Sequence, residues 1–180
     1  MTLNEYQTKA LTTAQYKDKV IYPALKILGE AGEVCEKIGK VYRDNNGEFT
    51  VEIKKELAKE LGDVMWYIAV LSHDCGFDLE TYGIVRNDSD VGKLFADETE
   101  VAISIRLMDM AIWASTRAVL YQQRPGWEKE TALRAGICVE LVQRLASIFG
   151  YTLQEILEMN VNKLADRKER GKIHGSGDNR

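Results

Sequence analysis

Apolar residues recur at steps of three and four positions along most of the chain, a spacing that places them on one face of an α-helix. The clearest stripes lie in residues 23–43 and 51–74. The same period predicts further helices over residues 3–18, 97–121, 128–149 and after the turn-like residues 150–155. Pro23 suits the first turn of its helix, and the chain has only two prolines to interrupt the others. The pattern therefore predicts an all-α fold.

Composition narrows the class of protein. With 180 residues the chain fits one domain, and 45% hydrophobic residues with 29% charged residues are typical of a soluble globular protein. The net charge of -4 gives no overall basic field for nucleic acid. No secretory pattern opens the chain, and no apolar run approaches the roughly 20 residues of a membrane span. We therefore expect a cytoplasmic protein with neither a nucleic-acid nor a membrane partner.

Two pairs of carboxylates stand out within the strongest helical segments. Glu30 and Glu33 are three residues apart, as are Glu60 and Asp63. Each pair lies on one helix face, at the margin of the apolar stripe, where the like charges repel one another. Packing the two helices as an antiparallel pair brings the acidic margins together, so that a cation is needed between them. Carboxylate oxygens without a Glu-x-x-His partner favour Mg²⁺ or Mn²⁺.

The alternative is that these acids are simply solvated, as acidic pairs on helices often are. Three glycines inside the same helices weigh against it, since each costs about 1 kcal/mol of helix stability relative to alanine. They are Gly29, Gly32 and Gly62. Such a cost suggests a close helix approach or room for a ligand.

At these residues the sequence resembles the MazG-like nucleotide pyrophosphohydrolases of the all-α NTP pyrophosphatase superfamily. The resemblance rests on an ExxE motif at Glu30–Glu33 and an ExxD motif at Glu60–Asp63, separated by residues 34–59. It extends to Glu5-Tyr6-Gln7, to residues 36–44 and to the last 30 residues, including Asn160-Val-Asn-Lys163-Leu164. The resemblance implies a helical bundle of that superfamily's type.

The resemblance also implies an activity and roles for individual residues. The activity is hydrolysis of a (d)NTP between the α and β phosphates, giving a (d)NMP and pyrophosphate, with Mg²⁺ as cofactor and Mn²⁺ as a substitute. The metal ligands and catalytic acids implied are Glu30, Glu33, Glu60 and Asp63. The substrate contacts implied are Asn160, Lys163, Arg167, Lys172 and Arg180 for phosphates, Gln7, Trp66 and Tyr67 for the base, and Lys37 for a part of the substrate left open. Some relatives carry an extra acid as general base directly before the first motif, where this chain has Gly29.

One departure from the family pattern concerns the middle of the chain. A helix-to-helix turn at residues 76–80 is repeated at residues 150–155, before the helix that carries Asn160. We therefore predict a single domain over residues 1–180 with an insertion at about 81–150 and a phosphate-side helix and tail at 151–180. The two apolar helices of the insertion could complete a four-helix core, supply a surface for a homodimer or higher homo-oligomer, or cap the substrate.

Two other classes of function compete with an enzyme at this stage. The chain could be a non-catalytic helical nucleotide-binding or regulatory protein that retains the bundle, or a purely structural helical dimer. Metal binding that depends on the acidic motifs would argue against the structural dimer. Release of pyrophosphate would distinguish the enzyme from the non-catalytic nucleotide-binding protein.

Overall fold

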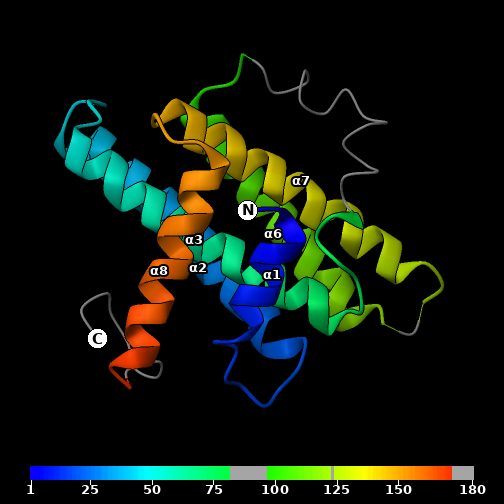
Figure 1. Cartoon of the computed structure of the whole chain (residues 1–180). Coiled ribbons are helices and arrows are strands. Elements are labelled where there is room, and N and C mark those ends of the chain that lie inside the picture. Colours follow the sequence, from blue (N-terminus) through cyan, green and yellow to red (C-terminus); the bar gives the residue numbers. More distant parts are fainter. Residues whose placement is uncertain (82–96, 123, 172–180) are drawn as a thin grey trace.

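The computed structural model describes residues 1–81, 97–122 and 124–171. Over these residues the only regular secondary structure is helix. Figure 1 shows the arrangement of the helices. They are α1 (Leu3–Leu11), α2 (Ile21–Asp44), α3 (Val51–Asp74), α6 (Glu100–Leu120), α7 (Trp127–Ile148) and α8 (Leu153–Glu169). The predicted all-α class is confirmed. None of these helices is both long and apolar enough to cross a membrane.

Threonine side chains define the first turn of four of the helices. The hydroxyls of Thr2, Thr50, Thr99 and Thr152 each accept a hydrogen bond from a main-chain N–H of the first turn. The main-chain N–H groups of Thr2 and Thr152 donate in turn to the side chains of Glu5 and Glu155, which completes two capping boxes. The Thr50 cap explains why the helix predicted over 51–74 begins at Val51.

The first helix is shorter than predicted, since α1 ends at Leu11 and not near residue 18. The hydroxyls of Thr12 and Thr13 donate to carbonyls of the last turn, which ends the helix. The following segment is held elsewhere: the Tyr16 hydroxyl and the Val20 N–H both donate to Asp74 Oδ2, at 2.8 and 3.1 Å. A contact 58 residues away in sequence therefore overrides the local apolar period.

Four helices form the centre of the molecule. α2 and α3 are an antiparallel hairpin, α6 packs on α2, and α7 packs on both α6 and α3, so that the four close into a bundle. α1 and α8 cover the remaining side of α3. Residues from all six described helices enter one hydrophobic core. The two described helices of the predicted insertion therefore take part in a four-helix core, which is one of the three roles considered for them, and the insertion itself stays a prediction.

Candidate active site

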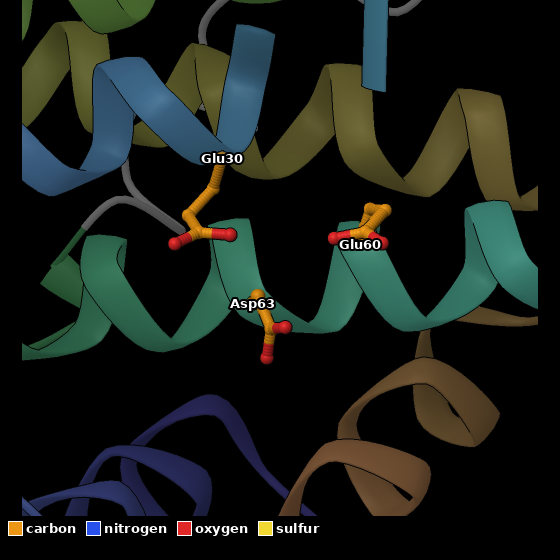
Figure 2. A group of neighbouring side chains, drawn as sticks. All are labelled: Glu30, Glu60 and Asp63. Carbon is orange, nitrogen blue, oxygen red and sulfur yellow. The ribbon is translucent and has the colours of Figure 1, made fainter. Parts of the chain in front are cut away.

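Three of the four predicted acids converge between α2 and α3. Carboxylate oxygens of Glu30, Glu60 and Asp63 all lie within 4.8 Å of one another. Figure 2 shows Glu30 reaching from α2 toward α3, which supplies Glu60 and Asp63. Glu33 is exposed on α2 and does not belong to this group in the structure. Of the four carboxylates expected to converge, three do so, and Glu33 lies one helical turn from Glu30.

Burial makes this group of carboxylates electrostatically unusual. Glu30 and Glu60 are only 8% and 3% exposed. Burial raises the pKa of Glu60 to about 7, against the opposing effect of Lys37, and the charges of Asp63 and Glu33 raise it further. Burial also raises the pKa of Glu30, which Lys26 counteracts. Such carboxylates demand a cation partner when they are ionised.

Each of the three carboxylates has a lysine partner in this conformation. Lys26 Nζ lies 3.0 Å from Glu30 Oε1, and Lys37 Nζ lies 3.2 Å from Glu60 Oε1. Lys163 Nζ donates to both oxygens of Asp63 at 2.6 Å. Lys37 and Lys163 were predicted as substrate contacts, whereas Lys26 had no predicted role.

A buried hydrogen-bond chain holds Asp63 from the side of α1 and α8. The Tyr6 hydroxyl donates to Asn160 Oδ1 at 2.9 Å, and Asn160 Nδ2 donates to Asp63 Oδ1 at 3.0 Å. Helix α8 can approach this closely because residue 62 is glycine: a Cβ there would lie 3.0 Å from Asn160 Cβ. The predicted close approach is therefore the reason for Gly62. Asn160 contacts a carboxylate in this structure, and its contact with phosphate stays a prediction.

Gln7 and Trp66, both predicted to contact the base, use their polar atoms in hydrogen bonds within the protein. Gln7 Nε2 donates to the carbonyls of Ala69 and Phe77, and its Oε1 accepts from the N–H of Leu79. Trp66 Nε1 donates to Ala10 O and to Thr13 Oγ1. Both side chains are buried, and their polar atoms brace α1 and the end of α3, so that a direct contact of either with a base is not what this conformation offers.

Of the remaining predicted phosphate contacts, Arg167 is the one that the structure describes. Arg167 is on the face of α8 that also carries Asn160 and Lys163, but it is buried, with 4% exposure. Lys172 and Arg180 lie outside the described residues.

A cluster of tyrosines next to the acids was only partly foreseen. Tyr22 stacks on Tyr16 with ring centroids 5.0 Å apart, and its hydroxyl is 3.5 Å from that of Tyr67. Lys26 Nζ lies 5.6 Å from the centroid of the Tyr67 ring and also pairs with Glu30, so that it connects the tyrosines to the acids. The i, i+4, i+8 spacing of Tyr22, Lys26 and Glu30 is the signal that could have identified Tyr22.

The donor set fits a hard divalent cation. The three convergent side chains offer only oxygen ligands, and no cysteine or histidine belongs to this group. The cysteines of the protein form no disulfide, and Cys75 and Cys138 are buried elsewhere in the core. Among the described residues, this is the group of acids whose geometry suits a metal ion.

Comparison with known proteins bears directly on this helix pair. Residues 23–82 match the family model of the MazG nucleotide pyrophosphohydrolase domain, a range that holds both acidic motifs. Over its whole length the chain is also 26% identical, across 188 aligned residues, to the full length of "Gene 37 protein" of Mycobacterium phage L5. No solved structure matches the chain.

Proposed function

We propose that this chain, whose residues 23–82 match the family model of the MazG nucleotide pyrophosphohydrolase domain, hydrolyses a nucleoside triphosphate between the α and β phosphates. The products are a nucleoside monophosphate and pyrophosphate. The observation that supports this most directly is the convergence of Glu30, Glu60 and Asp63 within 4.8 Å, two of them buried. The substrate is a ribo- or deoxyribonucleotide.

Glu30, Glu60 and Asp63 would hold Mg²⁺, or Mn²⁺ in its place, and Glu33 lies one turn away on α2, where a change of rotamer could add a further oxygen. The bound ion would neutralise phosphate oxygens and lower the pKa of a coordinated water molecule. The protein's own contribution is to keep these carboxylates close and shielded from bulk water. Asn160 and Tyr6 keep Asp63 in one orientation through their hydrogen-bond chain.

Basic and aromatic side chains next to the acids suggest how the substrate lies. Lys37 and Lys163 are within reach of phosphates bound at the acidic group, and Lys172 and Arg180 are further candidates from the chain's end. Tyr22, which is partly exposed, and Tyr67 form an aromatic surface beside Glu30, connected to it by Lys26. We assign base stacking to these two tyrosines in place of Gln7 and Trp66.

A pyrophosphate-release assay over the common NTPs and dNTPs, with Mg²⁺ or Mn²⁺, tests this proposal. Wild-type protein should release pyrophosphate and nucleoside monophosphate in equal amounts. Glu60→Gln and Asp63→Asn should lose at least about a hundredfold in kcat, because each removes a charge that the metal requires. Glu52→Gln is the matched control, since Glu52 is an exposed acid of the same helix α3 and lies outside the acidic group.

Absence of turnover with every nucleotide and both metals would reject the proposal. Thermal stabilisation by nucleotides without product would then support the non-catalytic nucleotide-binding alternative.

We also propose that the protein works in the cytoplasm as a homodimer or higher homo-oligomer, without a nucleic-acid partner. The support for association is apolar surface on two adjacent helices: Ile21 and Leu25 of α2, and Ile105, Ile112 and Val119 of α6, are exposed.

A further inference from the structure

Three lysine side chains of the protein supply cations to the acidic group formed by Glu30, Glu60 and Asp63. Lys26 and Lys37 come from α2 and Lys163 from α8, and each makes an ion pair with a different carboxylate of the group. Within the group the pairs are therefore distributed one lysine to one acid, with nitrogen–oxygen distances of 3.0, 3.2 and 2.6 Å, while Lys37 Nζ also lies 4.0 Å from Glu56 Oε2 outside the group. This regularity requires an explanation beyond ordinary surface ion pairing.

The three ammonium groups satisfy the same requirement that a divalent cation would. Three carboxylates within 4.8 Å repel one another, and an unpaired charge on a side chain as buried as that of Glu60 is costly. A lysine and a metal ion both use the lone pairs of the carboxylate oxygens. They therefore compete, and binding of a metal ion to these oxygens must weaken or break the lysine contacts.

The displaced lysines have space to move without leaving the site. Lys37 lies at the edge of a surface pocket of about 310 Å³ that runs along α2 and α3 past Glu56. Lys26 lies near the ring of Tyr67, and all three side chains are partly exposed. Because a lysine side chain is long and its head group is a compact point charge, the ammonium can swing to a new acceptor a few ångströms away.

We propose that Lys26, Lys37 and Lys163 are exchange residues, which hold the three carboxylates in the metal-free protein and transfer to the phosphate groups of the substrate when metal binds. This inference rests on the proposed function, because it needs a polyphosphate substrate at the acidic group. It makes metal binding and polyphosphate binding mutually reinforcing: each ligand releases or occupies the groups that would otherwise oppose the other. The lysines thereby prevent tight metal binding without substrate.

The first test measures the affinity of the full-length protein for Mn²⁺ alone by calorimetry. Lys37→Met should bind Mn²⁺ about tenfold more tightly than wild type, because the competing ammonium is gone. Lys40→Met is the matched control: Lys40 is one turn away on α2, pairs with Glu36 at 2.6 Å, and makes no contact with the three acids. It should change Mn²⁺ affinity by less than about twofold, which separates contact competition from long-range charge.

The second test measures binding of inorganic tripolyphosphate at saturating Mn²⁺. Here Lys37→Met should bind about tenfold more weakly than wild type, while Lys40→Met stays unchanged. The opposite signs of the two effects are the signature of an exchange residue. A residue that only stabilises the fold would lower both affinities, and a melting curve of each variant in EDTA shows whether the fold is retained. Lys26→Met provides a second variant with the same expected pattern.

Equal Mn²⁺ affinities for Lys37→Met and Lys40→Met would overturn the exchange, as would a loss of both affinities in a folded Lys37→Met and Lys26→Met. Failure of both wild type and Lys37→Met to bind Mn²⁺ would overturn it too. The result is independent of turnover, since both readouts are binding constants. Opposite effects on the two affinities in a protein that hydrolyses no nucleotide would leave the exchange intact while rejecting the proposed activity.

Discussion

At the scale of single residues, the chemistry of the site depends on where burial leaves a carboxylate. Glu60 and Glu56 are one turn apart on α3 and identical in type, yet only Glu60 is enclosed, and burial raises its pKa to about 7. Its position opposite Glu30 follows from the rotation of α3 against α2. The same side chain is therefore a metal ligand candidate at one position and an ordinary surface acid at the other.

The first prediction concerns pH. Only the ionised form of Glu60 can bind a metal ion, and its raised pKa means that protons compete with the metal as the pH falls through about 7. Metal affinity should therefore be highest above pH 7 and should decline toward about tenfold per unit below it. Calorimetric titration with Mn²⁺ at about pH 8, 7 and 6 measures this. In Glu60→Gln the affinity should be low and nearly constant over the range, and a wild-type affinity that does not change would contradict the assignment.

The second prediction concerns Tyr6, a positioning residue that does not reach the substrate. Tyr6→Phe removes the donor to Asn160 Oδ1, so that the amide is no longer held with its Nδ2 toward Asp63. We expect a loss of stability of about 1–2 kcal/mol and a severalfold rise in the Mg²⁺ concentration needed for half-maximal turnover. Ser115→Ala is the control, because it also removes a buried hydroxyl donor, at 2.8 Å from Ala24 O, away from the acids. If both variants had the same Mg²⁺ dependence, Tyr6 would be merely structural.

At the scale of elements, the approach of α8 to α3 builds half of the site. α8 brings Asn160 and Lys163 to Asp63 only because its backbone passes directly over Gly62. Gly39, in α2, is a contrast, since nothing lies within 4 Å of where its Cβ would be. Gly62 thus allows a close contact between two helices, whereas Gly39 faces no neighbour among the described residues.

The third prediction uses that contrast. Gly62→Ala should destabilise the protein by about 1–3 kcal/mol and reduce activity, because the added methyl group overlaps Asn160. Gly39→Ala should stabilise it by up to about 1 kcal/mol through its better helix propensity. Thermal or urea unfolding monitored by circular dichroism gives both values. A Gly62→Ala variant as stable as Gly39→Ala would show that α8 is not held against α3 as described.

At the scale of the whole molecule, α6 and α7 give the chain its own four-helix core. Because they pack on α2 and α3 within one chain, the described acidic group needs no second subunit for its framework. Exposed apolar residues remain on α2 and α6, however, and the two helices lie next to each other. A second copy of the chain is the partner proposed for this surface, since oligomers of identical subunits pair the same patch across a two-fold axis.

The fourth prediction tests that association. Light scattering should give wild type a mass of at least twice 20.4 kDa, and the double variant Leu25→Glu/Ile112→Glu should shift toward a monomer, because two buried charges in an apolar interface are costly. Val51→Glu is the control, a charge placed on an exposed apolar residue at the start of α3, where association should persist. A monomeric wild-type protein would refute the proposal.

The sequence alone determined the features that depend on neighbouring residues. Helical period and acids three residues apart act within one or two turns, so α2 and α3 and the two acidic motifs were predictable from the chain, and the MazG resemblance followed from the same residues. Contacts between distant segments were decided by tertiary structure. These include the end of α1, which Tyr16 and Asp74 help to set, and the separation of Glu33 from the other acids.

Tertiary structure also decided how the polar side chains are used. Gln7 and Trp66 were read as base contacts, but both satisfy buried main-chain groups, a requirement visible only once α1 is packed on α3. The pairing of Lys26, Lys37 and Lys163 with three different acids depends on the relative rotation of α2, α3 and α8. Helical spacing specifies which face of a helix a residue occupies, whereas the partner across that face is set by packing, which has no local signal in the chain.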